Sequence, residues 1–252
     1  MSTPHLTPND VPAAGALTGR VVLITGAGAG LGRALAQTAA GLGATVVLVD
    51  RSVAALEAVY DAIEATGSPQ PAIYPMDLLG ATASDHAALA TRLQDELGGL
   101  DALVHNAADV GKPAPIDHYD IETWYRTLQV DLHAPFLLTR YCLPLLQQSP
   151  DGRLVAISDD AGRTGMPFHG AYGVAKWGLE GLIQTLVAEL GDASRLRVTS
   201  VDPGPMGTAL RAGAYPAEAE HGLTSPDSVA PRLVSLIDPA FEPVQGGQYR
   251  LA

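Results

Sequence analysis

The strongest constraint on the fold is the alternation of short apolar runs with longer helical segments. Runs such as RVVLIT (20–25) and ATVVLVD (44–50) are apolar without a break, so both of their faces are expected to be buried. The segment 53–63 between such runs repeats its apolar residues at helical spacing. Strands that alternate with helices in this way form a parallel sheet. The sequence therefore predicts an α/β fold, with one doubly wound parallel sheet of about seven strands and helices on both faces.

The same patterns locate the remaining elements. Further strands are expected at 71–77, 100–108, 152–158, 195–201 and 247–251. Further helices are expected at 30–43, 83–98, 121–136 (bent at Pro135), 171–190 and 225–237.

Neither a linker nor an internal repeat divides the 252 residues, a length that suits one large α/β domain. Pro4, Pro8 and Pro12 interrupt the beginning of the chain. The sequence therefore predicts a mobile N-terminal tail over residues 1–18 and one domain over residues 19–252, which holds the whole functional site.

Charge and composition exclude several classes of partner. The net charge is −12, with 15 Lys and Arg against 27 Asp and Glu, and no basic run occurs, so neither nucleic acid nor an anionic membrane is expected as a partner. No apolar run approaches the roughly 18 residues of a membrane span, and the first nineteen residues hold no Lys or Arg. The single cysteine, Cys142, fits a reducing compartment, and a cytoplasmic location is expected. The scattered histidines, without HExxH or paired cysteines, predict that no metal is bound.

A glycine-rich turn, TGAGAGLG (25–32), joins the first expected strand to the first helix. Gly26, Gly30 and Gly32 allow a tight turn and a close approach of the backbone to a ligand. The N-terminus of the helix then offers free N–H groups and a favourable dipole to a pyrophosphate. The turn therefore indicates a dinucleotide site, although a tight connection without a ligand would use the same glycines.

Asp50, at the end of the second expected strand, bears on the choice of dinucleotide. A carboxylate there can accept hydrogen bonds from the adenine-ribose diol and repels a 2′-phosphate, which favours NAD over NADP. Arg51 and Arg33 oppose this preference, since either could meet the phosphate of NADP. NAD is therefore the expected cofactor and NADP the alternative.

Tyr172 and Lys176 lie four residues apart in the expected helix 171–190. The spacing places both side chains on one face of the helix. A cation beside a tyrosine favours its phenolate form and lowers its pKa. The pair is therefore suited to proton transfer with Tyr172 as the acid/base, although ordinary surface pairs show the same spacing.

The glycine spacing TGxxxGxG, the YxxxK of Tyr172 and Lys176, and PGPMGT (203–208) together resemble the classical short-chain dehydrogenase/reductase (SDR) family, over residues of about 18 to 250. The resemblance implies a Rossmann-like fold and an NAD(P)-dependent oxidoreductase that transfers a hydride between nicotinamide and an alcohol or carbonyl substrate. It also implies a homodimer or homotetramer formed through the helices around 117–147 and 170–190.

The resemblance further implies roles for residues that match the family's motifs. In the family, the positions of Asp77 and Leu78 contact adenine, and the lysine also holds the nicotinamide ribose. The residues expected to bind the cofactor are Thr25, Gly26, Gly28, Gly30, Leu31, Gly32, Asp50, Arg51, Asp77, Leu78, Asn106, Ala107, Ala108, Val130, Tyr172, Lys176, Pro203, Gly204, Met206 and Thr208. A mostly apolar substrate pocket, suited to a medium-sized and fairly hydrophobic carbonyl or alcohol, is expected from Val110, Met166, Phe168, His169, Leu210 and Tyr215.

Four positions depart from the family's pattern. The segment that the family writes NNAG is HNAA here, with His105 in place of the first Asn and Ala108 in place of the Gly. The substrate-binding serine of the family is replaced by Asp159, and the helix asparagine by Asp131. The expected catalytic residues are therefore Asp131, Asp159, Tyr172 and Lys176.

The two acids leave three outcomes open. Asp159 could be protonated by burial and donate to a substrate carbonyl. It could instead stay ionised and select a substrate that carries a cation, such as an amine or iminium. Finally, since two added negative charges raise the pKa of Tyr172, the site could bind cofactor and turn over slowly. The protein would then be a nucleotide-binding sensor or partner module with weak or no catalysis.

Overall fold

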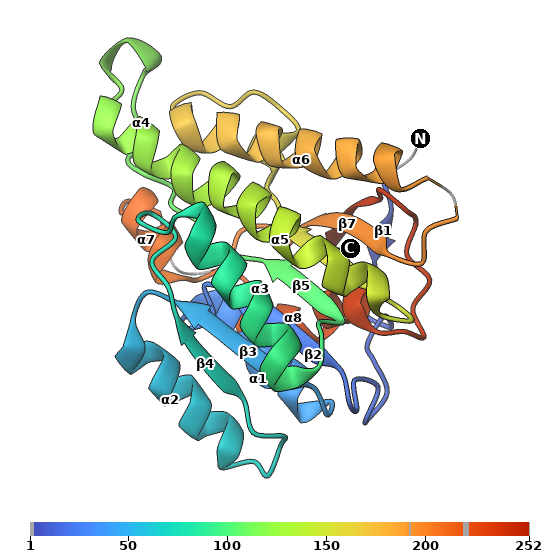
Figure 1. Ribbon diagram of the computed structural model, residues 1–252. Coiled ribbons are helices and arrows are strands. Elements are labelled where there is room, and N and C mark those ends of the chain that lie inside the picture. The colour runs from blue at the N-terminus through green and yellow to red at the C-terminus, as the bar shows by residue number, and fades with distance from the viewer. Residues whose placement is uncertain (1–2, 192, 219–221, 252) are drawn as a thin grey trace.

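One parallel sheet forms the centre of the computed structural model, which describes residues 3–191, 193–218 and 222–251 (Figure 1). Its eight strands lie in the order β1-β8-β7-β6-β5-β2-β3-β4, and each pairs in parallel with its neighbours. The strands are β1 (His5–Leu6), β2 (Val21–Thr25), β3 (Thr45–Asp50), β4 (Ala72–Pro75), β5 (Ala102–His105), β6 (Arg153–Ile157), β7 (Arg197–Asp202) and β8 (Gln248–Leu251).

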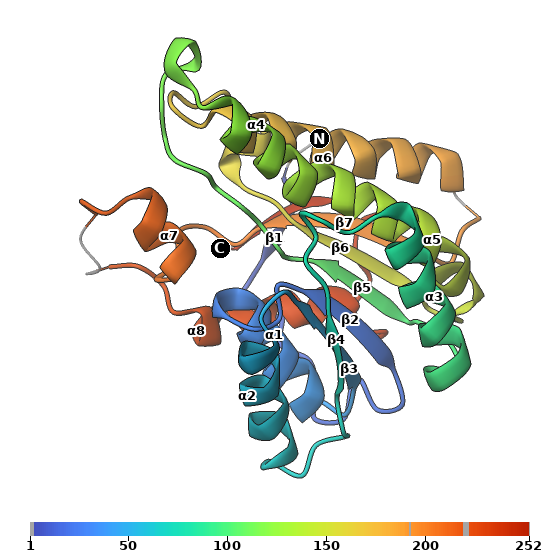
Figure 2. The same ribbon diagram turned by 60° about the vertical axis from the view of Figure 1, so that its left-hand side comes forward.

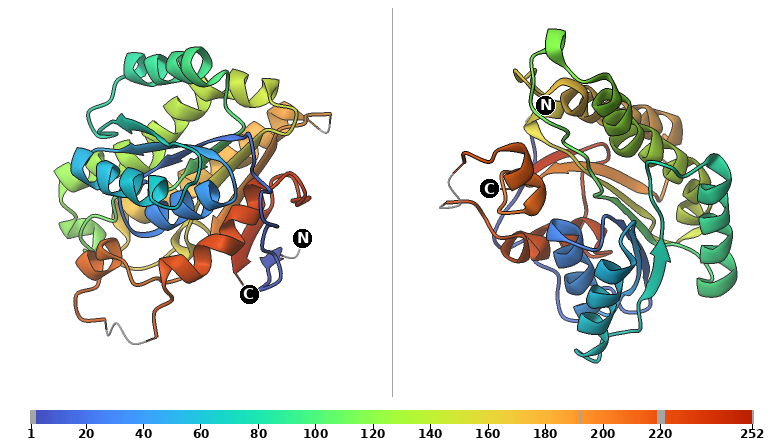
Figure 3. Two further views of the ribbon diagram at one scale, coloured as in Figure 1. Left: turned by 90° about the horizontal axis from the view of Figure 1, so that it is seen from below. Right: turned by 90° about the vertical axis from the view of Figure 1, so that its left-hand side faces the viewer.

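Helices cover both faces of the sheet (Figure 2). One layer holds α1 (Gly30–Gly41), α2 (Val53–Glu64) and α8 (Pro226–Val234), and the other holds α3 (Ala83–Leu97), α4 (Ile121–Leu128), α5 (Ala134–Gln148) and α6 (Gly170–Leu190). The short helix α7 (Ala209–Ala214) stands apart from both layers in Figures 2 and 3. Short 3₁₀ turns lie at Ile116–His118, Asp160–Gly162 and Ser235–Ile237. The predicted doubly wound α/β fold is confirmed.

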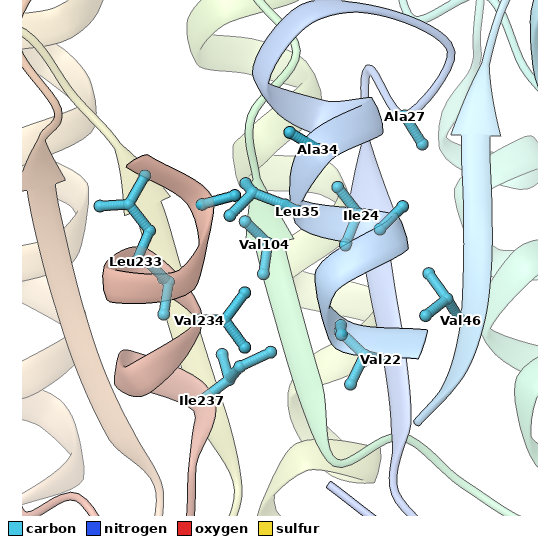
Figure 4. Close-up of a cluster of buried hydrophobic side chains, with 14 of the residues drawn as sticks. Val22, Ile24, Ala27, Ala34, Leu35, Val46, Val104, Leu233, Val234 and Ile237 are labelled. Carbon is cyan, nitrogen blue, oxygen red and sulfur yellow. The ribbon is translucent and has the colours of Figure 1, made fainter. Parts of the chain in front are cut away.

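Alternate residues of the central strands supply two hydrophobic clusters. Val22 and Ile24 of β2 point to the layer of α1 and α8, where they join Val104, Leu35 and Leu233 (Figure 4). Leu23, between them, belongs to the cluster under α3, α5 and α6. Because side chains of a strand point alternately to its two faces, an unbroken apolar run is what a strand covered on both faces needs.

The beginning of the chain differs from the expected mobile tail. β1 pairs with the last strand, and His5 lies opposite Arg250. Leu6 and Leu17 are fully buried in the cluster that includes α1 and α8. The pairing of β1 and the two buried leucines therefore attach the beginning of the chain to the domain, although most side chains between them are exposed. This short strand also accounts for the eighth member of the sheet.

The expected bend at Pro135 takes a specific form. A π-helical turn at Gln129–His133 separates α4 from α5, and Pro135 lies in the first turn of α5. Proline has no N–H to donate to the carbonyl one turn back, which is that of Asp131. The wider π-turn accommodates this loss and places Asp131 toward the centre of the molecule, where the residue is buried.

β2 pairs with β3 on one side and with β5 on the other, so the direction of winding reverses between β2 and β5. In doubly wound folds, ligands bind beside such a switch point, at the carboxyl ends of the strands. No helix among the described residues has the length and apolar character needed to span a membrane.

Candidate active site

A large cavity of about 1240 Å³ lies at the carboxyl ends of β2, β3, β5, β6 and β7. The expected cofactor and substrate residues that line it are Gly26, Gly28, Gly30, Leu31, Asp50, Arg51, Asp77, Leu78, Asn106, Ala107, Ala108, Val110, Val130, Asp159, Met166, His169, Tyr172, Lys176, Pro203, Gly204, Met206, Thr208, Leu210 and Tyr215. Thr25, Gly32, Asp131 and Phe168, which were also expected at the site, are not part of this lining.

The glycine-rich turn forms one wall of the cavity. Gly26 and Gly30 have φ of +67° and +51°, a region that favours glycine. Within the described residues, the N-terminus of α1 has neither a side-chain cap nor an acidic residue in its first turn. Its backbone N–H groups, at Ala29 to Leu31 in the cavity wall, therefore suit an anionic ligand.

Thr25 lies behind the wall and Asn106 lines it, and together they fix the turn to β5. The Thr25 hydroxyl accepts hydrogen bonds from the N–H groups of Asn106 (3.0 Å) and Ala107 (3.1 Å). The Asn106 side chain donates to the carbonyl of Thr25 at 2.9 Å. Gly32 has a similar role, since a Cβ there would lie 2.0 Å from the carbonyl oxygen of Gly26. Thr25 and Gly32 therefore shape the cradle from behind.

Asp50 lines the cavity beside the glycine-rich turn. Its carboxylate accepts from the N–H groups of Gly28 (3.2 Å) and Ser52 (3.0 Å). Arg51 is exposed and lines the cavity. Arg33 instead forms an ion pair with Asp227 at 2.9 Å, outside the lining. Only one of the two arginines considered for a 2′-phosphate therefore lies at the cavity.

α6 brings Tyr172 and Lys176 together at the other end of the cavity. Both are buried, and the Lys176 ammonium lies 5.5 Å from the centre of the Tyr172 ring. Lys176 donates to the carbonyl of Ile157 at 3.0 Å, and its Nζ is 4.0 Å from Oδ2 of Asp131. The lysine is therefore shared between the tyrosine, a strand carbonyl and a buried acid.

Asp159, and not Ser158, reaches the tyrosine hydroxyl. The Tyr172 hydroxyl donates to Oδ2 of Asp159 at 3.2 Å, while Oδ1 accepts from the N–H of Ala161 at 2.8 Å. The Oγ of Ser158 is buried and finds no hydrogen-bond partner among the described residues. At the position where the family's pattern has a serine, the side chain next to the Tyr172 hydroxyl is thus a carboxylate.

Two acids act on the pKa of Tyr172 in the same direction. Burial raises this pKa well above 10, and the charges of Asp159 and Asp131 raise it further. Asp131 accepts from the N–H of Asp109 at 2.6 Å and is almost fully enclosed. Burial raises the pKa of Asp131 to about 7, although Lys176 lowers it. The hydroxyl of Tyr172 is therefore strongly biased toward its protonated form.

The two substitutions in the HNAA segment have different consequences. His105 is buried in β5, and its Nε2 lies 2.8 Å from the Thr139 hydroxyl of α5. Burial lowers the pKa of His105 to about 3, so the ring is neutral and joins the sheet to a helix. The methyl group of Ala108 adds to the cavity wall.

The substrate end of the cavity is more polar than expected. His169 accepts from the Tyr215 hydroxyl at 2.7 Å, with Nε2 as acceptor if Nδ1 donates to the carbonyl of Pro167. Phe168 has φ of +69° and is 56% exposed, and it is not part of the cavity lining, contrary to expectation.

Polar residues that were not expected also line this end: Asp109, Arg126, Ser158, Asp160, Asp202, Arg211 and Glu218. Arg126 donates to Asp109 at 2.5 Å, and Arg211 donates to Glu218 at 2.6 Å. The Arg126–Asp109 pair joins different elements, so no local sequence signal points to it. Among the described residues, no group of three or more His, Cys, Asp or Glu is arranged to hold a metal ion.

Comparison with known proteins agrees with this geometry. The family model described as short chain dehydrogenase matches residues 20–219. The uncharacterized oxidoreductase YciK of Escherichia coli (strain K12) is 37% identical over 90% of this chain and 89% of its own length.

Two solved structures are similar over nearly the whole fold, both with a TM-score of 0.90. One, from Shigella flexneri and complexed with NADP, is 36% identical and covers 94% of this chain and 99% of its own. The other, from Escherichia coli CFT073 and complexed with NADPH, is 37% identical and covers 95% and 99%. With the family match, the sheet order and the Tyr172–Lys176 site in agreement, the chain belongs to the classical short-chain dehydrogenase/reductase family of oxidoreductases.

Proposed function

We propose that this protein is an NAD(P)-dependent oxidoreductase that transfers a hydride between nicotinamide and an alcohol or carbonyl carbon, with Tyr172 as the acid/base. The observation that carries the proposal is the buried Tyr172–Lys176 pair in the same cavity as the uncapped N-terminus of α1. One end of the cavity thus suits a pyrophosphate, and the other suits proton transfer.

The residues present fit a nicotinamide dinucleotide. The glycine-rich turn from Gly26 to Gly30 would bind the pyrophosphate. The turn leaves no room for a side chain at Gly28, because a Cβ there would lie 2.9 Å from the Cβ of Ala55. Asp77 and Leu78 would lie against the adenine, and Pro203 and Thr208 would hold the nicotinamide amide. When bound, nicotinamide supplies or accepts the hydride.

The chain's own groups manage the proton. In carbonyl reduction, the Tyr172 hydroxyl gives its proton to the substrate oxygen. Lys176 stabilises the negative charge that develops on the tyrosine oxygen and would also bind ribose hydroxyls. The raised pKa of Tyr172 keeps its hydroxyl protonated near neutral pH, which is the form that acts as the acid.

The choice of dinucleotide is proposed to depend on Asp50 and Arg51. Asp50 supports NAD, since its carboxylate would repel a 2′-phosphate. The NADP and NADPH complexes of two similar proteins support NADP, and the exposed Arg51 offers a phosphate partner. We retain NAD as the proposed cofactor, and a ratio of kcat/KM for NADPH over NADH above one would reverse this assignment.

Tyr172→Phe tests the proposed function. NADH and NADPH oxidation is measured against a panel of ketones and aldehydes, for the native protein and the variant. Loss of the proton donor is expected to lower kcat at least 100-fold, in line with the usual contribution of acid–base catalysis, while cofactor binding stays within about threefold. Equal turnover by the two proteins would contradict the role of Tyr172.

A nucleotide-binding sensor or partner module is the second candidate. It is favoured by the two acids that raise the pKa of Tyr172. This candidate would be supported if the dinucleotide bound tightly in calorimetry while no carbonyl or alcohol was turned over.

We also propose a homodimer or homotetramer. Apolar side chains are exposed on the outer helices α4 to α6: Tyr125 is 65% exposed, Phe136 48%, Val174 47% and Trp177 52%. Because α4 and the π-helical turn that leads into α5 pack against α6 (Figures 1 and 2), we propose that these residues share one apolar face that a second copy would cover.

A further inference from the structure

The cations at the substrate end of the cavity already have acidic partners. Arg126 donates to Asp109, and Arg211 holds Glu218 with two hydrogen bonds of 2.6 and 2.8 Å. Lys176 is directed to the Ile157 carbonyl and toward Asp131. These side chains are therefore engaged before a substrate arrives.

Other acids near Tyr172 are paired as well. Asp160 contacts the guanidinium of Arg250, and Asp202 lies 3.8 Å from the same side chain. Asp159 differs, because within the described ranges no Lys or Arg lies within ion-pair distance of its carboxylate. Its contacts are a backbone N–H and the Tyr172 hydroxyl. An acid without a cationic partner thus lines the cavity at the position of the reaction.

A second observation comes from Ser158, next to Asp159. The residue is 4% exposed and lines the same cavity, and its Oγ has no hydrogen-bond partner among the described residues. Buried hydroxyl groups are normally hydrogen-bonded. The carboxylate of Asp159 therefore lines the cavity without a cationic partner, next to a buried hydroxyl that no described group satisfies.

We propose that the substrate carries a protonated amino group two or three bonds from its carbonyl or carbinol carbon, and that Asp159 binds this ammonium. The substrate class is thus an amino ketone or amino alcohol. The proposal rests on the proposed oxidoreductase function and specifies its substrate.

The geometry at Tyr172 explains why a cation is needed. The Tyr172 hydroxyl donates its proton to the Asp159 carboxylate. A neutral ketone would therefore find no free hydrogen-bond donor at Tyr172. An ammonium that donates to Oδ2 of Asp159 releases the hydroxyl, which can then donate to the carbonyl oxygen. The same ion pair offsets the negative charge that raises the pKa of Tyr172. The cation therefore positions the substrate and frees the proton donor.

The reduction then balances without a further reactant. The carbonyl carbon gains the hydride from the reduced nicotinamide, and the electron pair of the C=O π bond takes the Tyr172 proton. The products are the hydroxyl group and the oxidised nicotinamide. The ammonium keeps its protons throughout, and solvent restores the proton of Tyr172.

Matched substrates test the proposal. Dimethylaminoacetone carries the cation, isobutyl methyl ketone has the same shape without it, and acetoacetate carries an anion. At pH 7, kcat/KM is expected to be at least tenfold higher for dimethylaminoacetone than for the neutral ketone, and lowest for acetoacetate. Asp159→Asn should reduce this preference to below threefold, and Asp159→Ser should raise turnover of the neutral ketone. Equal kcat/KM for the first two substrates in the native protein would overturn the proposal.

Asp160→Asn provides a matched control, because it removes one carboxylate from the adjacent residue of the same cavity. Asp160→Asn is expected to retain most of the preference for dimethylaminoacetone over isobutyl methyl ketone. If Asp160→Asn lost this preference as Asp159→Asn does, the effect would be one of general charge, which would contradict a specific role of Asp159.

Binding separates this proposal from the proposed function. Calorimetry of the cofactor-loaded protein is expected to show tighter binding of dimethylaminoacetone than of isobutyl methyl ketone, with the difference lost in Asp159→Asn. If turnover depended on Tyr172 but the two ketones bound equally well, the proposed amino substrate would be rejected and the proposed oxidoreductase function would stand. If dimethylaminoacetone bound selectively but was not turned over, the proposed oxidoreductase function would be rejected and the proposed cation site at Asp159 would stand.

Discussion

At Tyr172, burial and two acids act in the same direction on one hydroxyl. Asp159 touches the hydroxyl, whereas Asp131 acts through space and through Lys176, which lies 4.0 Å from it. Asp131 also anchors the backbone of Asp109, and so the loop that bears the Asp109–Arg126 pair. Asp131 thus raises the pKa of Tyr172 and also holds the backbone of the loop at Asp109 in place.

Asp131 gives a prediction for stability. Its pKa in the folded protein is about 7 against an ordinary 3.8, so the folded state binds the proton more tightly than the unfolded state. This contribution to stability is complete below pH 3.8 and is lost as the pH rises through about 7. Asp131→Asn removes the titration, so its unfolding free energy relative to native should rise between pH 5 and pH 8, by at most roughly 3 kcal/mol.

Urea unfolding at the two pH values measures this difference. Asp61→Asn, which removes an exposed carboxylate of α2, is the control. A difference between Asp131→Asn and native that does not change with pH would show that Asp131 is ionised throughout.

At the scale of the element, the turn from β2 to α1 depends on the absence of side chains. A Cβ at Gly32 would lie 2.0 Å from the Gly26 carbonyl oxygen and 2.6 Å from the Asn106 amide. Backbone cannot move aside cheaply, so Gly32→Ala is expected to destabilise the protein by roughly 2 kcal/mol or more and to weaken dinucleotide binding at least tenfold.

Gly41→Ala, in the last turn of the same helix, is the matched control. A Cβ there meets nothing within 4 Å, and alanine favours the helix by up to about 1 kcal/mol. Thermal unfolding and dinucleotide titration of both variants test the contrast. A Gly32→Ala protein with native affinity would show that the cradle tolerates a displaced turn.

The elements also show what sequence patterns can predict. Strands such as β2 and β3, and the glycines between them, follow from local signals because burial on both faces and a tight turn each demand particular residue types. The spacing of Tyr172 and Lys176 likewise places them on one helix face. The ion pair of Arg126 and Asp109 could not be predicted, since it depends on how α4 meets the loop after β5. The same holds for Phe168, which has a positive φ and lies outside the cavity lining.

For the whole molecule, the exposed apolar residues of α4 to α6 predict self-association. Trp177→Glu would place a charge in the proposed contact, and the resulting desolvation cost should convert a dimer or tetramer into a smaller species. Val53→Glu, on α2 in the opposite helical layer, replaces a side chain of similar exposure (48% against 52%) and is the control. Light scattering of the separated proteins gives the masses. A native protein with the mass of one chain, or a Trp177→Glu protein of unchanged mass, would exclude this interface.

The packing of the first residues has a consequence for the border of the sheet. β1 is the outermost strand beside β8, and it covers backbone N–H and C=O groups that β8 would otherwise expose. A chain that began at residue 20, where the family match begins, would leave β8 with an open edge and remove Leu6 and Leu17 from the core. Open edges recruit strands of other molecules. The pairing of His5 and Leu6 with Arg250 and Leu251 is thus expected to hinder association of other molecules with the last strand.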